Sequence, residues 1–203
     1  MLFFNLMNND SFPSFTLALL SFSHTRCLTE LVMQTAWRER DPKARIKAAK
    51  DALEKNAECA TALILLAEED SPTVIEVEKL MRQALKVAEL SYRKSQQYQH
   101  QSALNEGTFR RDTNVLIYIK RRLAMCARKL GKLKEATKMM RDLIKEFPMM
   151  NVFNVHENLI EALLEMQAYA DVQAVLAKYD GMHIKVNVCS RSMRKWNFRL
   201  WTA

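Results

Sequence analysis

The sequence predicts an all-α fold in which antiparallel helical hairpins stack as a short solenoid. Only three glycines and four prolines interrupt 203 residues. Met, Leu, Ala, Lys, Glu, Arg and Gln, the residues that lose least on entering a helix, fill most of the rest. Apolar residues recur at i, i+3, i+4 and i+7, the spacing of an amphipathic helix. The helices also follow one another in pairs at a spacing near 34 residues.

The composition disfavours several classes of enzyme and metal protein. Neither G-x-G-x-x-G nor G-x-x-x-x-G-K-[ST] occurs, which disfavours the nucleotide-binding enzymes of the α/β classes. The chain has no C-x-x-C, and its four histidines are scattered. The cysteines are equally far apart: Cys27, Cys59, Cys126 and Cys189. We therefore expect reduced thiols in a cytosolic setting, with no metal site and no cofactor.

The pattern divides the chain into a leader (1–32), a helical-repeat domain (33–180) and a basic tail (181–203). In the leader, the best apolar run, 12–22, is about half the ~20 residues that a membrane-spanning helix needs. Asp10 lies where a secretory signal would carry a basic residue. We expect leader and tail to be poorly ordered, with a weak interfacial anchor as the alternative for the leader.

The first two hairpins follow from their caps and apolar stripes. A helix that is regular from about Glu30 should stop near Asp41, because proline disfavours helical geometry in the residue before it, and Pro42 should then open the next helix. A more buried helix follows in "ECATALILLAEED". Ser71 is the expected N-cap of the long helix after it, with Pro72 at its first position.

A polar, Gln-rich insertion at about 91–111 interrupts the pattern. It lacks an apolar stripe, so we expect a helix extension and then a loop around Gly107. Helix should resume with Asp112 or Thr113 as its cap.

The stretch "LAMCARKLGKLKEATKMMRDLIKEFP" has the layout of two helices joined by a hinge. Glycine can end the first helix in a left-handed conformation, and a proline stops the second helix. The stretch resembles a tetratricopeptide repeat, although Lys120 stands where that repeat has its first Trp. The matching positions are Leu123, Ala124, Ala127, Gly131, Ala136, Met140, Leu143 and Pro148.

Equivalent positions recur in the second helix of each pair. A close-packing residue is followed by apolar residues at +4 and +7, and the +7 positions fall at 52, 84, 143 and 179. Their spacings are 32, 59 and 36, so two lie near the tetratricopeptide period and the third contains the insertion. The interpretation is an array of about four hairpins.

Longer segments resemble the suppressor of tumorigenicity 7 family, from about Met33 to Asp180. They include "AWRERDPKARIKAAKDALE", "CATALILLAEE" and "NVHENLIEALLEMQAYADVQAVLAKYD". The resemblance implies a helical-repeat region within a larger animal protein that has membrane-spanning segments on both sides. It also implies a role in restraining cell growth, and it supplies no catalytic residues.

Both ends are expected to depart from that family, as alternative or truncated ends would. The leader lacks the membrane spans, and "GMHIKVNVCSRSMRKWNFRLWTA" does not look like the family continuation. The family implies membrane association, whereas this sequence contains no convincing transmembrane segment. A cytoplasmic or peripheral location is therefore also open.

The candidate function is a non-enzymatic protein-interaction scaffold. The face built from first helices would present a cluster suited to an acidic peptide or helix, because guanidinium groups bind carboxylates in two places. The alternative for these residues is an ordinary solvated helix surface. The candidate partner-binding residues are Asn114, Tyr118, Arg121, Arg122 and Arg128.

The charge distribution suggests a second function, as a peripheral membrane module. Residues 110–145 hold twelve Lys and Arg against three Asp and Glu, a net +9, and the tail adds +5. An anionic lipid surface would suit this block and the tail. Nucleic acid is disfavoured, because Tyr118 is the only aromatic residue of the block.

Catalysis is disfavoured as well. His156, Glu157, Glu161 and Glu165 do not all share one helix face, and H-E-x-x-H is absent. His156 is expected in a first turn or at the surface.

Overall fold

The computed structural model describes residues 22–148 and 155–180. Within these ranges every regular element is a helix, which confirms the all-α prediction. The helices are α2 (Phe22–Arg38), α3 (Pro42–Lys55), α4 (Ala60–Glu69), α5 (Val74–Tyr98), α6 (Ala103–Lys129), α7 (Leu133–Glu146), α8 (Val155–Glu165) and α9 (Tyr169–Asp180). The chain forms two compact units, Met1–Cys126 and Ala127–Ala203, whose boundary lies within α6.

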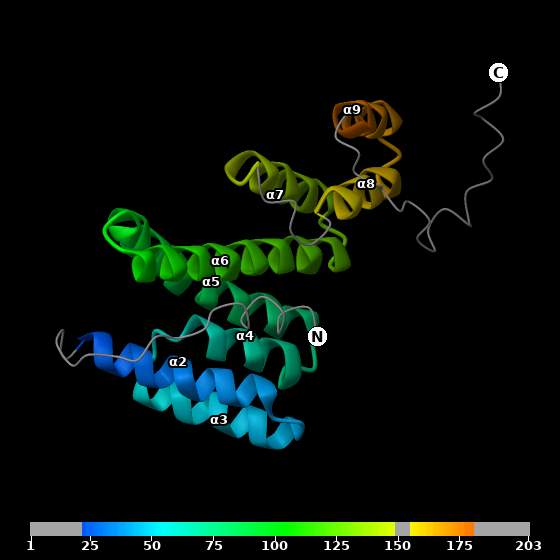
Figure 1. Cartoon of the computed structure of the whole chain (residues 1–203). Coiled ribbons are helices and arrows are strands. Elements are labelled where there is room, and N and C mark those ends of the chain that lie inside the picture. The colour runs from blue at the N-terminus through cyan, green and yellow to red at the C-terminus, as the bar shows by residue number, and fades with distance from the viewer. Residues whose placement is uncertain (1–21, 149–154, 181–203) are drawn as a thin grey trace. The chain divides into compact units, whose positions relative to one another are not determined.

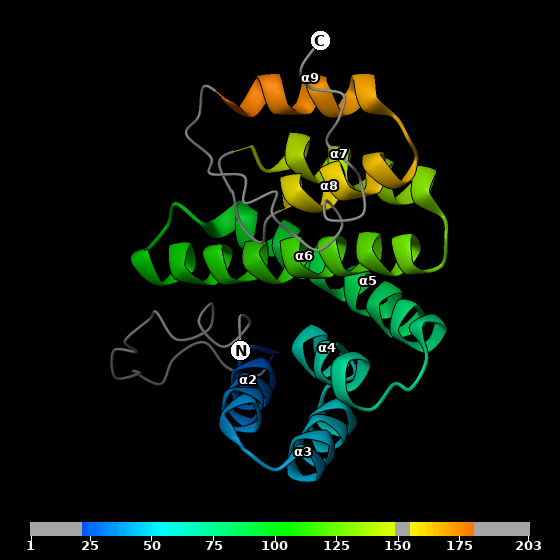
Figure 2. The same ribbon diagram turned by 90° about the vertical axis from the view of Figure 1, so that its right-hand side faces the viewer.

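In the first unit, consecutive helices pack side by side. α2 contacts α3, α3 contacts α4, and α4 contacts α5 (Figure 1, Figure 2). Small residues allow this close approach, since Ala49, Ala52 and Ala62 are completely buried, and Met33 and Leu65 fill the space between them. α4 is buried along most of its length, as its apolar sequence predicts.

Two helix starts show how caps set the boundaries. Asp41 caps α3 by accepting a hydrogen bond from the Lys43 amide, and Pro42 occupies the first turn, as predicted. α5 differs from the prediction, because Thr73 caps it and accepts from the Glu76 amide at 3.3 Å. This Thr-x-x-Glu spacing is that of a capping box. Ser71 instead donates to the Leu66 carbonyl at the end of α4.

The acidic end of α4 is neutralised by its neighbours. Carboxylates at a helix C-terminus are unfavourable, because the helix dipole is negative there. The structure offsets this with cations from α3: Arg45 binds Glu69 at 2.9 Å, and Lys50 binds Asp70 at 2.9 Å. Glu68 bonds to α6. The run Glu-Glu-Asp therefore ties α4 to two helices.

The insertion is more helical than its polarity suggests. α5 continues to Tyr98 and α6 starts at Ala103, so the break lies at 99–102 and not at Gly107. The physical reason is that Gln, Lys and Glu are good helix formers without an apolar stripe. The Ser102 hydroxyl caps α6 by accepting from the Asn105 amide at 3.2 Å. Asp112 and Thr113, expected as caps, are buried inside α6, where Thr113 donates to the Phe109 carbonyl.

The second unit contains the end of α6 with α7, α8 and α9. α7 packs on α8, and α8 packs on α9 (Figure 2). The predicted repeat positions form its interior: Ala127, Ala136, Met140 and Leu143 are all buried. Leu123 and Ala124, which belong to the first unit, are buried as well. Pro148 is exposed and follows Phe147, the C-cap of α7.

Two turns of the second unit use the same hydrogen-bond pattern. At the end of α6, the Gly131 amide donates to Arg128 and the Lys132 amide donates to Ala127. At the end of α8, the Gln167 amide donates to Leu164 and the Ala168 amide donates to Leu163. Both are Schellman motifs with a left-handed residue at the turn. That residue is Gly131 (φ 77°) in one and Gln167 (φ 58°) in the other.

The boundary of the leader also differs from the prediction. α2 begins at Phe22, and its residue Thr29 is buried, so the helix extends into the segment for which little order was expected. The preceding leader residues and the tail 181–203 lie outside the described residues, as do Met149 and Met150. No helix in the described part of the chain is both long and apolar enough to span a bilayer.

Candidate functional site

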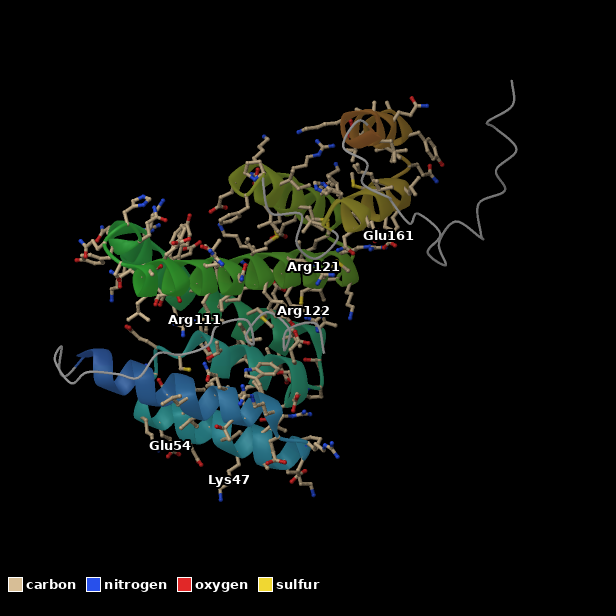
Figure 3. All side chains as sticks on the ribbon, in the orientation of Figure 1. Lys47, Glu54, Arg111, Arg121, Arg122 and Glu161 are labelled. Atoms are coloured by element: carbon tan, nitrogen blue, oxygen red, sulfur yellow. The ribbon has the colours of Figure 1, made fainter. Side chains whose placement is uncertain are left out.

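α6 carries all five predicted partner-binding residues. Asn114, Tyr118, Arg121 and Arg122 lie on its part within the first unit, and Arg128 lies on its last turn, within the second. All five side chains are half-buried. Figure 3 labels Arg121 and Arg122 along this helix. The structure does not bring the five together at one contact: Tyr118 and Arg122 share one acid, and Arg128 binds two others.

The first cluster forms around the carboxylate of Glu68 on α4. The Tyr118 hydroxyl donates to Glu68 Oε1 at 3.0 Å. Arg122 donates Nε to Oε1 at 2.6 Å and Nη2 to Oε2 at 2.7 Å, the two-pronged geometry of a strong ion pair. The Arg122 and Glu68 side chains are 27% and 23% exposed, so the pair is only partly screened by solvent. We call these three residues the Glu68 cluster.

Burial and charge shift the pKa values in and beside this cluster. Burial raises the pKa of Tyr118, and the Glu68 charge raises it further. Burial alone would lower the pKa of Arg122, but its hydrogen bonds to Glu68 and the Glu68 charge give a net rise. Burial lowers the pKa of Arg121, and Tyr118 partly opposes that effect. The phenol is thus held neutral, and Arg122 is held charged.

The second cluster forms around Arg128 and bridges two carboxylates of α8. Arg128 Nη1 donates to Glu161 Oε2 at 2.6 Å, and Nη2 donates to Glu165 Oε1 at 2.5 Å. The hydrogen bond to Glu165 is the largest cause of the raised pKa of Arg128, and it outweighs the opposing effect of burial. Arg128 is only 15% exposed. We call these three residues the Arg128 cluster, and it holds the end of α6 against α8.

His156 lies in the first turn of α8, as predicted, and is buried. Burial lowers its pKa, and the positive charge of Lys178 lowers it further. Glu161 and Glu165 are engaged by Arg128. Two of the three carboxylates considered for catalysis therefore join helices.

A small pocket lined by both polar and apolar side chains lies in the first unit, where α2, the α3–α4 connection, α5 and α6 meet. Its volume of about 60 Å³ leaves room for a few water molecules. Thr29, Cys59, Arg111 and Asp112 are among its lining residues. Cys59 and Cys126 are both buried, and neither forms a disulfide. Among the residues described, no three His, Cys, Asp or Glu side chains gather as a metal site.

In the basic block 110–145, arginines and lysines differ in whether they form ion pairs. Several of its arginines bond within the chain: Arg110 to Glu106, Arg111 to Asp112, Arg122 to Glu68, Arg128 to Glu161 and Glu165, and Arg141 to Asp171. Several of its lysines are exposed and have no carboxylate within 4 Å among the described residues: Lys129, Lys134, Lys138 and Lys145.

The sequence reasoning missed Glu68, Glu161 and Glu165 as partners of the candidate site. Glu68 lies 54 positions before Arg122, and Glu161 lies 33 positions after Arg128. Neither distance corresponds to a spacing within one helix. An available signal was the acidic run at the end of α4, because a helix C-terminus tolerates acids poorly unless cations are near.

Comparison with known proteins gives the family. The family model described as "ST7 protein" matches residues 2–192. A Protein ST7 homolog of Drosophila pseudoobscura is 70% identical over 154 residues, 75% of this chain and 28% of the relative. The bovine Suppressor of tumorigenicity 7 protein-like is 65% identical over 156 residues, 77% of this chain and 28% of the relative. The human protein of that name is 64% identical, over 77% of this chain and 27% of its own length.

These relatives match about three-quarters of the chain and are much longer than it. The chain spans a little over a quarter of the length of the relatives it matches, and their names state no enzymatic activity. The family model extends beyond 33–180 on both sides, which corrects the expectation that the leader and the whole tail depart from the family. This chain belongs to the ST7, or suppressor of tumorigenicity 7, protein family.

Proposed function

We propose that this chain is a non-enzymatic protein-interaction scaffold built from tetratricopeptide-like hairpins. The proposal is supported by a division among the charged side chains: some hold helices together, and others remain exposed. The Glu68 cluster and the Arg128 cluster employ buried or half-buried acids and arginines to hold helices together. Several lysines of the same basic block remain at the surface. This arrangement favours a rigid helical framework that presents positive charge to a partner.

The hairpin geometry supports the same proposal. Fully buried alanines at Ala49, Ala52, Ala84 and Ala136 allow the close helix approach that stacked repeats require. The two Schellman turns of the second unit occur at 131 and 167, a spacing of 36 residues, close to the tetratricopeptide period.

The partner class we propose is an acidic peptide or helix. Of the five α6 candidates, Tyr118, Arg122 and Arg128 already bond to carboxylates of this chain. A partner acid at these positions would have to displace Glu68, Glu161 or Glu165. The exposed Lys129, Lys134, Lys138 and Lys145 would meet a partner without that competition.

Peripheral binding to anionic lipid is the second candidate, and one observation favours it. Lys129, Lys134, Lys138 and Lys145 are exposed, and no carboxylate of the described residues neutralises them. Juxtaposed lysines attract anionic lipid headgroups, and the attraction is screened by salt. In this reading the arginines again stabilise the fold.

Fractionation of cells that express the full chain separates the two candidates. A scaffold should be recovered in a discrete complex that chemical cross-linking captures in stoichiometric amounts and that resists detergent. A lipid-binding module should pellet with membranes at moderate salt and be released at high salt. Recovery of the chain as a free monomer in every fraction would overturn the proposal.

A further inference from the structure

The outer face of α7 carries a straight basic stripe. Lys134, Lys138, Arg141 and Lys145 are spaced i, i+4, i+7 and i+11, so they share one face over three turns, roughly 16 Å. All four are exposed. The opposite side of the helix is buried through Ala136, Met140 and Leu143. The stripe therefore faces away from the core of the second unit.

The stripe is largely uncompensated. Arg141 Nη2 bonds to Asp171 Oδ2 on α9 at 2.8 Å, and both side chains are about half exposed. Lys134, Lys138 and Lys145 have no carboxylate within 4 Å in the part of the chain that the structure describes. Three of the four positive charges are thus available to an anionic partner.

A second stripe on the same helix restricts the shape of that partner. Glu135, Asp142 and Glu146 are also exposed and follow the spacing i, i+7 and i+11, about a quarter turn away from the lysines. A flat anionic bilayer would meet both stripes, and the exposed carboxylate of Asp142 would repel it. None of the large hydrophobic side chains that the described structure exposes lies on α7, so the helix offers nothing to insert into lipid. A narrow acidic partner would cover the lysines alone.

We propose that the basic stripe of α7 docks an acidic helix of a partner protein, with carboxylates spaced i, i+4, i+7 and i+11. This inference rests on the proposed scaffold function and names the partner's chemistry. Helices packed side by side bring such stripes into register over several turns. Because the ion pairs are exposed, binding is expected to weaken as salt rises.

α3 supplies a closely matched control. It has the same length as α7, 14 residues, and Lys43 and Lys47 occupy the second and sixth positions, as Lys134 and Lys138 do in α7. Its stripe continues differently: Lys50 is bound by Asp70, and Glu54 takes the fourth place. Figure 3 shows Lys47 and Glu54 pointing outward from α3. The double variant Lys43→Glu with Lys47→Glu thus changes the charge by the same amount as Lys134→Glu with Lys138→Glu. Both pairs of substitutions lie near the N-terminus of their helix.

The test measures binding of the full chain to a fluorescent helical peptide by anisotropy at low and physiological salt. The probe carries Glu at i, i+4, i+7 and i+11, and a second probe of equal composition distributes its Glu around the helix. We expect Lys134→Glu with Lys138→Glu to weaken binding about tenfold, and the α3 pair to change it by less than about twofold. The scrambled probe should bind more weakly to the unaltered chain. Circular dichroism of both variants confirms that they fold.

Several outcomes would overturn the inference. Equal loss in the α3 and α7 variants would mean that only net charge matters. Equal binding of the two probes, together with α7-dependent binding to phosphatidylserine vesicles, would assign the stripe to a membrane. Cross-linking in cells separates this failure from that of the scaffold: if the α7 variant captures the same partner as the unaltered chain, the scaffold stands and docking on α7 is wrong. If the probe result holds and no partner is captured, the docking face stands and the scaffold function is wrong.

Discussion

The Glu68 cluster and the Arg128 cluster join helices by opposite arrangements of charge. In the first unit, one carboxylate on α4 receives hydrogen bonds from a phenol and a guanidinium of α6. In the second unit, one guanidinium at the end of α6 donates to two carboxylates of α8. The residue at the centre is therefore an acid in one cluster and a base in the other. Loss of the centre should be more damaging than loss of a peripheral member, because it leaves two half-buried groups without partners.

Glu68→Ala should have the largest effect. It removes the acceptor of Tyr118 and Arg122 together, and an uncompensated half-buried guanidinium is expensive, so we expect a loss of about 2–3 kcal/mol in unfolding free energy. Urea denaturation of the full chain, monitored by circular dichroism, measures this change in unfolding free energy. Asp70→Ala is the control two residues away, because its pair with Lys50 is exposed and should be worth less than about 0.5 kcal/mol. Equal effects would show that the buried geometry is irrelevant.

Arg128→Met tests the centre of the second cluster. The change leaves Glu161 and Glu165 one turn apart and repelling each other, so we expect a loss of about 1–2 kcal/mol. Hydrogen exchange by mass spectrometry should show faster exchange in α8 and unchanged exchange in α4. Glu165→Gln is the peripheral counterpart, and it should have a smaller effect because Arg128 keeps Glu161. A larger effect of Glu165→Gln would reverse the ranking of centre over periphery.

Tyr118→Phe removes a peripheral member of the first cluster and should cost about 1 kcal/mol near neutral pH. The pKa of Tyr118 is raised in the folded chain, so the folded state favours the protonated phenol. Its contribution is complete below the ordinary tyrosine pKa of about 10 and is lost as pH rises through the higher folded value. The stability difference between the unaltered chain and the Tyr118→Phe variant should therefore shrink above about pH 10, which urea denaturation at several pH values measures. A difference that grows with pH would mean that the phenolate is the stabilised form.

The contrast between the clusters also shows which parts of this structure a sequence can predict. The start of α3 at Pro42 and the all-helical class were predicted from local signals. The repeat positions Ala136, Met140 and Leu143 were identified from local spacing, and they are buried. The break after α5 was misplaced, since a glycine suggests a loop while the surrounding Gln and Glu favour helix. The carboxylate partners of the α6 arginines depend on which helices pack together, and this information is not local.

From the sequence, arginines of the basic block were expected to bind carboxylates of a partner, and the lysines entered only through the net charge. Arginine's planar fork binds carboxylates in two places, whereas lysine is a strongly hydrated point charge. That difference is consistent with arginines bonding inside the fold while Lys134, Lys138 and Lys145 stay exposed. Three of the five predicted partner-binding residues, Tyr118, Arg122 and Arg128, therefore join helices. Much of the exposed positive charge of the block lies on α7.

The smallest expected effect concerns the turns of the second unit, where one Schellman motif is visible in the sequence and the other is not. Gly131 takes its left-handed conformation freely, but Gln167 adopts φ 58° with a side chain. Gln167→Gly relieves that backbone strain, which stabilises the folded state. Glycine also makes the unfolded chain more flexible, which offsets part of this effect, so we expect a net stabilisation of about 0.5 kcal/mol. Gly131→Ala is the reverse case: an added Cβ would meet no atom within 4 Å, so backbone strain alone should destabilise the chain by about 1 kcal/mol. Thermal unfolding of both variants measures the two changes in stability. If both substitutions destabilise the chain, the Gln167 side chain contributes more than its backbone strain takes away, and the two turns are equivalent only in their hydrogen bonds.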